Sequence, residues 1–168
     1  MKLFPSVIEA PLPEQALLNE FVERGEYTDC FVTRVDRVAT FPAFVESFYT
    51  TRLFKLERLI LKWLISRPSS DEEARQLARD EIHVFAAWHE HSRSDDQLIM
   101  MDFRQQTCSW FMLVGDERAS HLYFGSAVMR DVDESSGKKM KWTYRALLGF
   151  HRLYSRALLH AAARQLSR

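Results

Sequence analysis

The sequence predicts an α+β protein, in which an antiparallel sheet of about five strands packs against a long C-terminal helix. Residues 107–114 and 120–129 are strand-like runs that flank the short turn 115–119, a pattern typical of a β-hairpin. Apolar residues recur at helical spacing over 42–65 and again over 143–166. Helices that precede and follow a run of hairpins are typical of the α+β class.

The hairpin is apolar on both of its faces. Trp110 and Met112 point to one face, whereas Phe111 and Leu113 point to the other. A strand with one face in water alternates apolar and polar residues, and this one does not. Both faces must therefore be covered. Helix is the expected cover of one face, and the other cover is a second layer, a partner chain or the wall of a ligand cavity.

Length and composition limit the classes of protein to which the chain can belong. The 168 residues fit one domain, 1–168, with residues 1–12 as an N-terminal arm. Hydrophobic residues make up 46% and charged residues 27%, as in ordinary globular proteins. The 23 basic residues balance 23 acidic ones, so no global field favours nucleic acid, and we expect no nucleic-acid partner.

Several features favour a cytoplasmic protein. The N-terminus lacks the apolar core and cleavage site of a signal peptide. The longest apolar stretch, 53–65, is interrupted by charged residues too often for a membrane span, so we expect none. Cys30 and Cys108 both lie in apolar runs, which suits reduced core thiols better than a disulfide framework.

The N-terminal half is predicted to be mainly helical. A short helix begins near Pro13 and ends near Gly25, and residues 27–36 form the first strand. Thr40 can cap the helical region 42–65. We expect that region to break near Thr50 and Thr51, since paired β-branched residues with hydroxyl groups weaken a helix. A capping box at residues 70–73 then opens a helix that runs to about residue 79.

Strands dominate the second half. Residues 84–91 and 97–103 are two further strands joined by the polar turn 92–96, and the apolar hairpin follows them. Residues 133–139 form a loop by composition, and the closing helix spans 143–166.

This order of elements resembles the helix-grip arrangement of the START and polyketide-cyclase-like superfamily. More narrowly, Tyr27-x-Asp29-x-Phe31 and Phe150-His-Arg-x-Tyr154 resemble a bacterial family of uncharacterised domains with the same grip. The resemblance implies a C-terminal helix that lies across the sheet, with a ligand cavity between them.

Aromatic, methionine and histidine residues near that sheet and helix are the candidate binding residues. His151 lies one helical turn from Tyr154, which permits the two side chains to act together; the alternative is packing at the edge of the core. For the candidates on the predicted strands, packing in the core is also the commoner role. The candidate ligand-binding residues are Trp88, His89, Trp110, Met112, Tyr123, His151 and Tyr154.

No catalytic or metal motif is complete. His89 and His91 share one face of a predicted strand, as two metal ligands would, but a third ligand at matching spacing is missing. We therefore expect no metal and no cofactor. Ser126 follows Gly125 but lacks the second glycine and the strand-to-helix context of a nucleophile elbow.

Three functions compete. The leading hypothesis is a cytosolic binding module for a small apolar or amphipathic molecule, held between the sheet and the C-terminal helix. A homo-oligomeric interaction protein with a filled core, such as a homodimer, is the second. The third is an enzyme of the cyclase, dehydratase or hydrolase type, whose proton carriers in the same cavity would come from His89, His121, His151 or Tyr154.

Overall fold

The computed structural model describes residues 6–66, 68–129 and 139–168. Its strands are β1 (Ile8–Glu9), β2 (Tyr27–Val35), β3 (Val84–Phe85), β4 (Trp88–Arg93), β5 (Gln97–Asp102), β6 (Thr107–Gly115) and β7 (Ser120–Val128). Its helices are α1 (Asn19–Glu23), α2 (Phe41–Tyr49), α3 (Arg52–Ile65), α4 (Asp71–Ala78) and α5 (Lys139–Leu166). The strands form one antiparallel sheet in the order β1-β2-β7-β6-β5-β4-β3, so the α+β class is confirmed.

The predicted count of about five strands was wrong, because the sheet has seven within the described residues. The predicted strand 84–91 is divided into β3 and β4, which fold back on each other through a turn where Ala86 adopts a φ of 52°. The arm contributes β1, which pairs Ile8 with Val32. Strands of two residues are too short to produce a periodic pattern that sequence can reveal.

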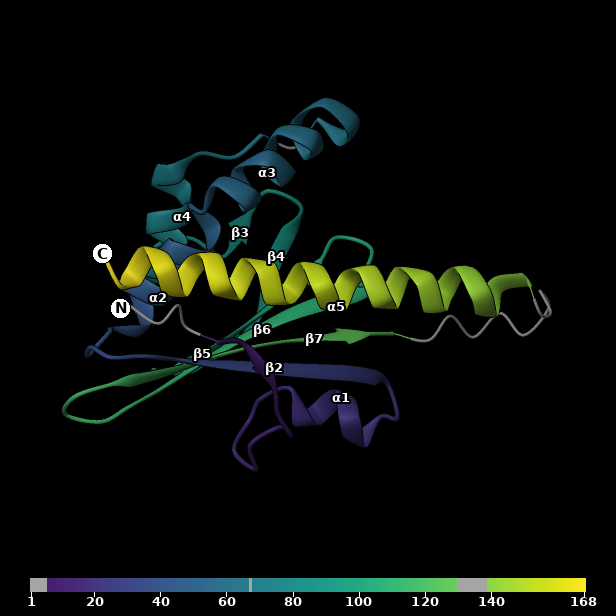
Figure 1. Cartoon of the computed structure of the whole chain (residues 1–168). Coiled ribbons are helices and arrows are strands. Elements are labelled where there is room, and N and C mark those ends of the chain that lie inside the picture. The colour runs from purple at the N-terminus through teal and green to yellow at the C-terminus, as the bar shows by residue number, and fades with distance from the viewer. Residues whose placement is uncertain (1–5, 67, 130–138) are drawn as a thin grey trace.

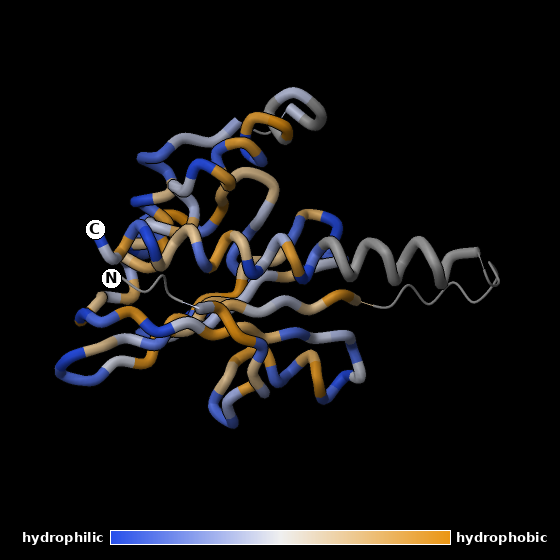
Figure 2. Tube along the Cα trace, viewed as in Figure 1, coloured by the Kyte–Doolittle hydropathy of each residue, from blue (hydrophilic) through white to orange (hydrophobic). Residues whose placement is uncertain are grey.

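The sheet is covered on both faces by its own chain. In Figure 1, α5 runs across one face of the sheet with α2, α3 and α4 on the same side, and α1 lies on the opposite face. Figure 2 shows apolar stretches along the strands between these two layers. None of the helices in the described part of the chain is long and apolar enough to cross a membrane.

Phenylalanine rings form the core on the α5 side. Phe48 of α2 contacts two strands at once: its ring centroid lies 4.8 Å from that of Phe111 on β6 and 4.6 Å from that of Phe124 on β7. Phe44 and Phe31 are fully buried in the same cluster. Phe31, Phe111 and Phe124 alternate along their strands with residues of the opposite face, as the period of two in a strand requires.

The opposite face is closed by the N-terminal segment and α1. Trp110 is fully buried there, and its indole N–H donates to Gln97 Oε1 at 2.9 Å. The same oxygen accepts from the backbone N–H of Leu17, while Gln97 Nε2 donates to the carbonyl of Gln15. One glutamine therefore fixes the segment before α1 over the sheet. The second cover of the hairpin is a layer of the same chain.

The predicted helix boundaries are confirmed at four points. Thr40 accepts a hydrogen bond from the Ala43 N–H at the start of α2, and α2 ends at Tyr49 where the break was expected. Ser70 forms a complete capping box with Glu73. Gly25, just beyond α1, has a φ of 75°. Most of the predicted loop 133–139 lies outside the described residues.

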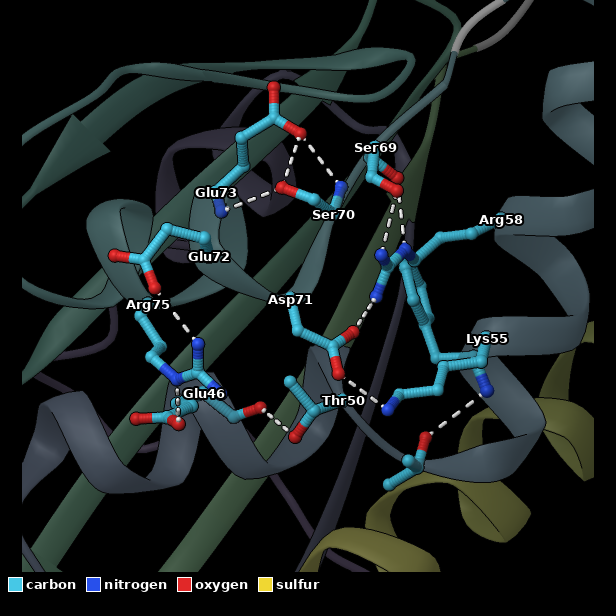
Figure 3. Close-up of polar contacts among 12 residues, drawn as sticks. Glu46, Thr50, Lys55, Arg58, Ser69, Ser70, Asp71, Glu72, Glu73 and Arg75 are labelled. Carbon is cyan, nitrogen blue, oxygen red and sulfur yellow. Dashed lines mark hydrogen bonds and ion pairs between the residues drawn. The ribbon is translucent and has the colours of Figure 1, made fainter.

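Ion pairs join α3 to α4. Figure 3 shows Asp71 between two cations of α3: its Oδ1 atom lies 2.6 Å from Arg58, and its Oδ2 atom lies 2.5 Å from Lys55. Arg58 also donates to the side chain and the carbonyl of Ser69. Partial burial raises the pKa of Asp71, but the hydrogen bonds and charges of its two partners outweigh that effect and lower it. The first two turns of α3 are therefore held to the start of α4.

Candidate cavity between the sheet and the C-terminal helix

A cavity of about 660 Å³ lies between the sheet, the α2–α3 pair and α5. Its lining residues are Phe48, Tyr49, Leu53, Phe54, Leu56, Glu57, Ile60, Trp88, Thr107, Cys108, Ser109, Phe124, His151, Tyr154, Ser155 and Leu158. The set draws on α2, α3, β4, β6, β7 and α5, so segments from most of the chain meet here.

Aromatic rings form much of the wall. Tyr49 and Phe54 follow each other across the α2–α3 break, with ring centroids 4.8 Å apart. Trp88 of β4 extends this surface, and its ring centroid lies 5.8 Å from that of Phe54. Phe48 and Phe124 of the same aromatic core also reach the cavity. The wall is apolar because α2, α3 and the sheet all turn their apolar faces to this volume.

The mouth of the cavity lies at α3. Leu56 and Ile60 line the cavity and are also exposed to solvent, at 56% and 47% of their surface. With exposed Leu59 and Trp63, they form an apolar stripe at the i, i+3, i+4, i+7 spacing of one helix face.

A carboxylic acid and a phenol face each other in the wall. The hydroxyl of Tyr154 on α5 donates a hydrogen bond to Glu57 Oε2 on α3. Burial raises the pKa of the Glu57 carboxyl, and the hydrogen bond from Tyr154 offsets this only in part. Burial and the nearby Glu57 carboxyl both raise the pKa of Tyr154 as well. The pair joins the two helices on either side of the cavity.

A second polar group lies where α5 crosses β7. His151 Nε2 shares a 2.8 Å hydrogen bond with Ser126 Oγ. The Ser126 N–H in turn donates to Asp29 Oδ1 at 2.9 Å, and Asp29 pairs with Ser126 across the β2–β7 ladder. Asp29 is only 6% exposed, and its Oδ2 atom has no hydrogen-bond partner among the described residues. Burial raises the pKa of Asp29, while His151 and the hydrogen bonding of Ser126 act to lower it.

This arrangement joins the two motifs that carried the family resemblance. Asp29 belongs to the first motif and His151 to the second, and Ser126 lies between them. Ser109 of β6 pairs with Ser126 of β7 and lines the cavity, so Asp29, Ser126 and Ser109 form one row across three strands. The row therefore brings hydroxyl, imidazole and carboxyl groups to one edge of the cavity. The Asp29 carboxyl binds the Ser126 backbone and not the imidazole, so this order differs from that of a serine hydrolase triad.

The structure brings three of the seven predicted binding residues together. Trp88, His151 and Tyr154 all line the cavity. The other four, His89, Trp110, Met112 and Tyr123, do not line it. Trp110, Met112 and Tyr123 belong to the core beneath the N-terminal segment, because side chains alternate along β6 and β7 and theirs point away from α5. His89 pairs with Met101 of that same core, and alternation along β4 turns its side chain to the opposite face from Trp88.

Sequence reasoning missed Glu57, Asp29 and Ser126 as members of the site. One signal was available for Glu57, since it interrupts the apolar residues Phe54 and Ile60 on one side of a helix. Nothing local distinguishes Ser126, because its partner His151 is 25 residues away in the sequence.

Asp80, His83 and Glu90 are the described residues whose ligand atoms gather closely enough to hold a metal ion. The Arg93 guanidinium lies between the carboxylates of Asp80 and Glu90, and one of its nitrogens is 2.9 Å from an oxygen of each. His83 lies 3.3 Å from Glu90. A guanidinium group neutralises these acids, so they form an ion-pair network. His91 bonds to Glu20 of α1 at 2.7 Å.

Comparison with known proteins finds no relative: no protein-family model, no curated protein and no solved structure matches this chain.

Proposed function

We propose that this protein binds a small apolar or amphipathic molecule in the cavity between its sheet and α5. The observation that carries the proposal is an aromatic-lined volume of about 660 Å³ with few polar groups. Pockets for small molecules typically measure about 300–1,000 Å³ and have this kind of lining.

The size of the cavity favours binding over a defect in packing. Protein interiors are packed as densely as organic crystals, and voids larger than a water molecule are few. Elsewhere the chain packs well: the large side chains around Phe48 and Trp110, including Phe31, Phe111 and Leu98, are completely or almost completely buried. A large apolar space beside such a core is best explained by an occupant.

The polar groups of the cavity are positioned to select among ligands. Glu57 and Tyr154 lie on one side of the cavity, and His151 with Ser109 lies near the sheet. A few convergent polar groups in an apolar pocket orient a ligand and exclude others that cannot match them. The proposal therefore favours an amphipathic molecule over a pure hydrocarbon.

Nile red, a neutral dye that fluoresces in apolar surroundings, tests the proposal directly. Ser109→Trp would place an indole in the cavity from β6, and Glu117→Trp in the exposed β6–β7 turn is the matched control. We expect wild type and control to bind the dye, and Ser109→Trp to bind it about tenfold more weakly or worse at an unchanged Tm. No dye binding to the wild type, or equal binding to all three proteins, would overturn the proposal.

Native mass spectrometry of the purified chain would identify the natural occupant. We expect a mass surplus over the chain that disappears on denaturation. The released molecule should be apolar or amphipathic and small enough for the cavity.

Catalysis in the same cavity is a second candidate. It is supported by the placement of two proton carriers, His151 and Tyr154, on one cavity. His89 and His121 do not line it, so of the four predicted proton carriers only His151 and Tyr154 could act in this cavity. Incubating the released ligand with wild type and with His151→Ala, followed by mass analysis of the small molecule, tests this candidate. A ligand that both proteins leave unchanged would rule it out.

Self-association is a third candidate, supported by the apolar stripe on α3. Trp63 is 77% exposed and Leu59 is 50% exposed, and contiguous apolar surface commonly marks an interface. Sedimentation of the wild type and of Leu59→Lys over a range of concentrations tests it. A wild type that stays monomeric at every concentration would exclude this candidate.

A further inference from the structure

We infer that the ligand carries a positively charged amine, which the Glu57 carboxylate binds inside the aromatic wall of the cavity. The inference rests on the proposed function and specifies the chemical class of its ligand.

The ionisable side chains of the cavity lining favour a cationic ligand. Glu57 is the only carboxylic acid among the described lining residues, and no lysine or arginine is among them. A second acid, Asp29, lies behind His151 at the edge of the cavity. Among these described residues, an anionic ligand would find carboxyl groups and no fixed cation. A cationic ligand would find a carboxylate.

Glu57 also differs from the other carboxylates near α3. Asp71 is bound by Lys55 and Arg58, and Glu46 is bound by Arg75. Glu57 has no ion pair with any described side chain, and its hydrogen bond comes from the neutral Tyr154 hydroxyl. A half-buried carboxylate without a counter-ion is costly, because burial removes its water and nothing replaces the lost charge stabilisation. The amine of a ligand would supply that counter-ion.

The aromatic rings favour the same class. Tyr49, Phe54 and Trp88 line the cavity together with Glu57, and the nearby Glu57 carboxyl contributes to the raised pKa of Tyr49. A cation over an aromatic face is attracted by the ring quadrupole, most strongly where water is excluded. A carboxylate beside several rings therefore suits an organic ammonium group with an apolar tail.

Three ligands of equal chain length separate this inference from its alternatives: decylamine, decanol and decanoate. Each competes with Nile red for the full-length protein near pH 7.5, below the concentration at which it aggregates. We expect decylamine to displace the dye at about tenfold lower concentration than decanol, with decanoate weakest. The charge of the head group is the main difference between them.

Variants assign the preference to one residue. Glu57→Gln should bring decylamine and decanol to within about threefold of each other, because an amide can accept a hydrogen bond but cannot neutralise a cation. Tyr154→Phe should keep the preference, since the carboxylate remains. Glu117→Gln in the exposed β6–β7 turn is the matched control and should behave as wild type.

The outcomes distinguish the two proposals. Nile red binding with equal displacement by all three ligands, or with decanoate as the best competitor, would overturn the amine inference and leave the binding function intact. An amine preference that persists in a folded Glu57→Gln protein would also overturn it. Failure of the wild type to bind Nile red and all three ligands would overturn both.

Discussion

Tyr154 of α5 donates a hydrogen bond to Glu57 of α3 across 97 residues of sequence, and this bond joins the two helices that flank the cavity. The bond satisfies the phenol in a largely apolar wall. It leaves the carboxylate without a counter-ion among the described residues. The contact therefore joins α3 to α5 and leaves the charge of Glu57 available to a ligand.

The unfolding free energy should depend on pH through Glu57. Burial raises the pKa of this carboxyl in the folded protein above its ordinary value of 4.5, so the folded state holds the proton more tightly than the unfolded state. Wild type should therefore lose stability as pH rises from about 4.5 through the raised pKa. Glu57→Gln cannot ionise, and its stability relative to wild type should increase over that window.

Urea unfolding followed by tryptophan fluorescence at several pH values measures this difference. Glu117→Gln is the control and should run parallel to wild type. A constant difference between Glu57→Gln and wild type from pH 4 to pH 8 would contradict the assignment.

Gly125 permits β2 and β7 to approach over Trp110. A Cβ atom at this position would lie 2.5 Å from the Asp29 carbonyl oxygen and 3.0 Å from Trp110 Cε3. The carbonyl belongs to the sheet backbone and cannot move freely, so Gly125→Ala should cost about 1–3 kcal/mol of unfolding free energy or more. Gly115→Ala meets nothing closer than 3.6 Å and should change stability by less than about 0.5 kcal/mol. Equal Tm values for the two variants would count against this packing.

Arg58 and Lys55 bind the same carboxylate but should contribute unequally. The Arg58 side chain is 10% exposed and binds Ser69 as well as Asp71, whereas the Lys55 side chain is 46% exposed. Arg58→Met should lower the unfolding free energy by about 1–3 kcal/mol, because it removes hydrogen bonds to a charged, partly buried group. Lys55→Met should cost less than about 1 kcal/mol, as exposed ion pairs do. Chemical denaturation of both variants compares them, and the reverse order would refute the argument.

Gln97 should be essential for the layer beneath the sheet. Its side-chain amide makes three hydrogen bonds, to Trp110, Leu17 and Gln15. Gln97→Met keeps most of the volume but leaves the buried indole N–H unpaired, which should cost about 2–3 kcal/mol. Hydrogen exchange should also increase in the segment before α1. The surface variant Gln106→Met should change neither property, and a similar result for both would mean that the segment is held by apolar packing alone.

The sequence predicted those features that short segments encode. Thr40, Ser70 and the Thr50–Thr51 break define helix ends through bonds to residues three or four positions away, so each was visible in the sequence. The alternation along the hairpin correctly separated Trp110 and Met112 from Phe111 and Leu113. The two-residue strands β1 and β3 had no such signal.

What the sequence by itself determined is therefore the α+β class, the helix ends and the division of the hairpin into two apolar faces. Which face lies toward the cavity was decided only by the tertiary structure. A period of two shows which side chains share a face, but not what lies above it, and Trp110 and Phe111 have equivalent patterns. The convergence of Glu57 with Tyr154, and of Asp29 with His151, likewise depends on how α3 and α5 cross the sheet. Chain topology sets such long-range contacts, and local residue patterns do not record them.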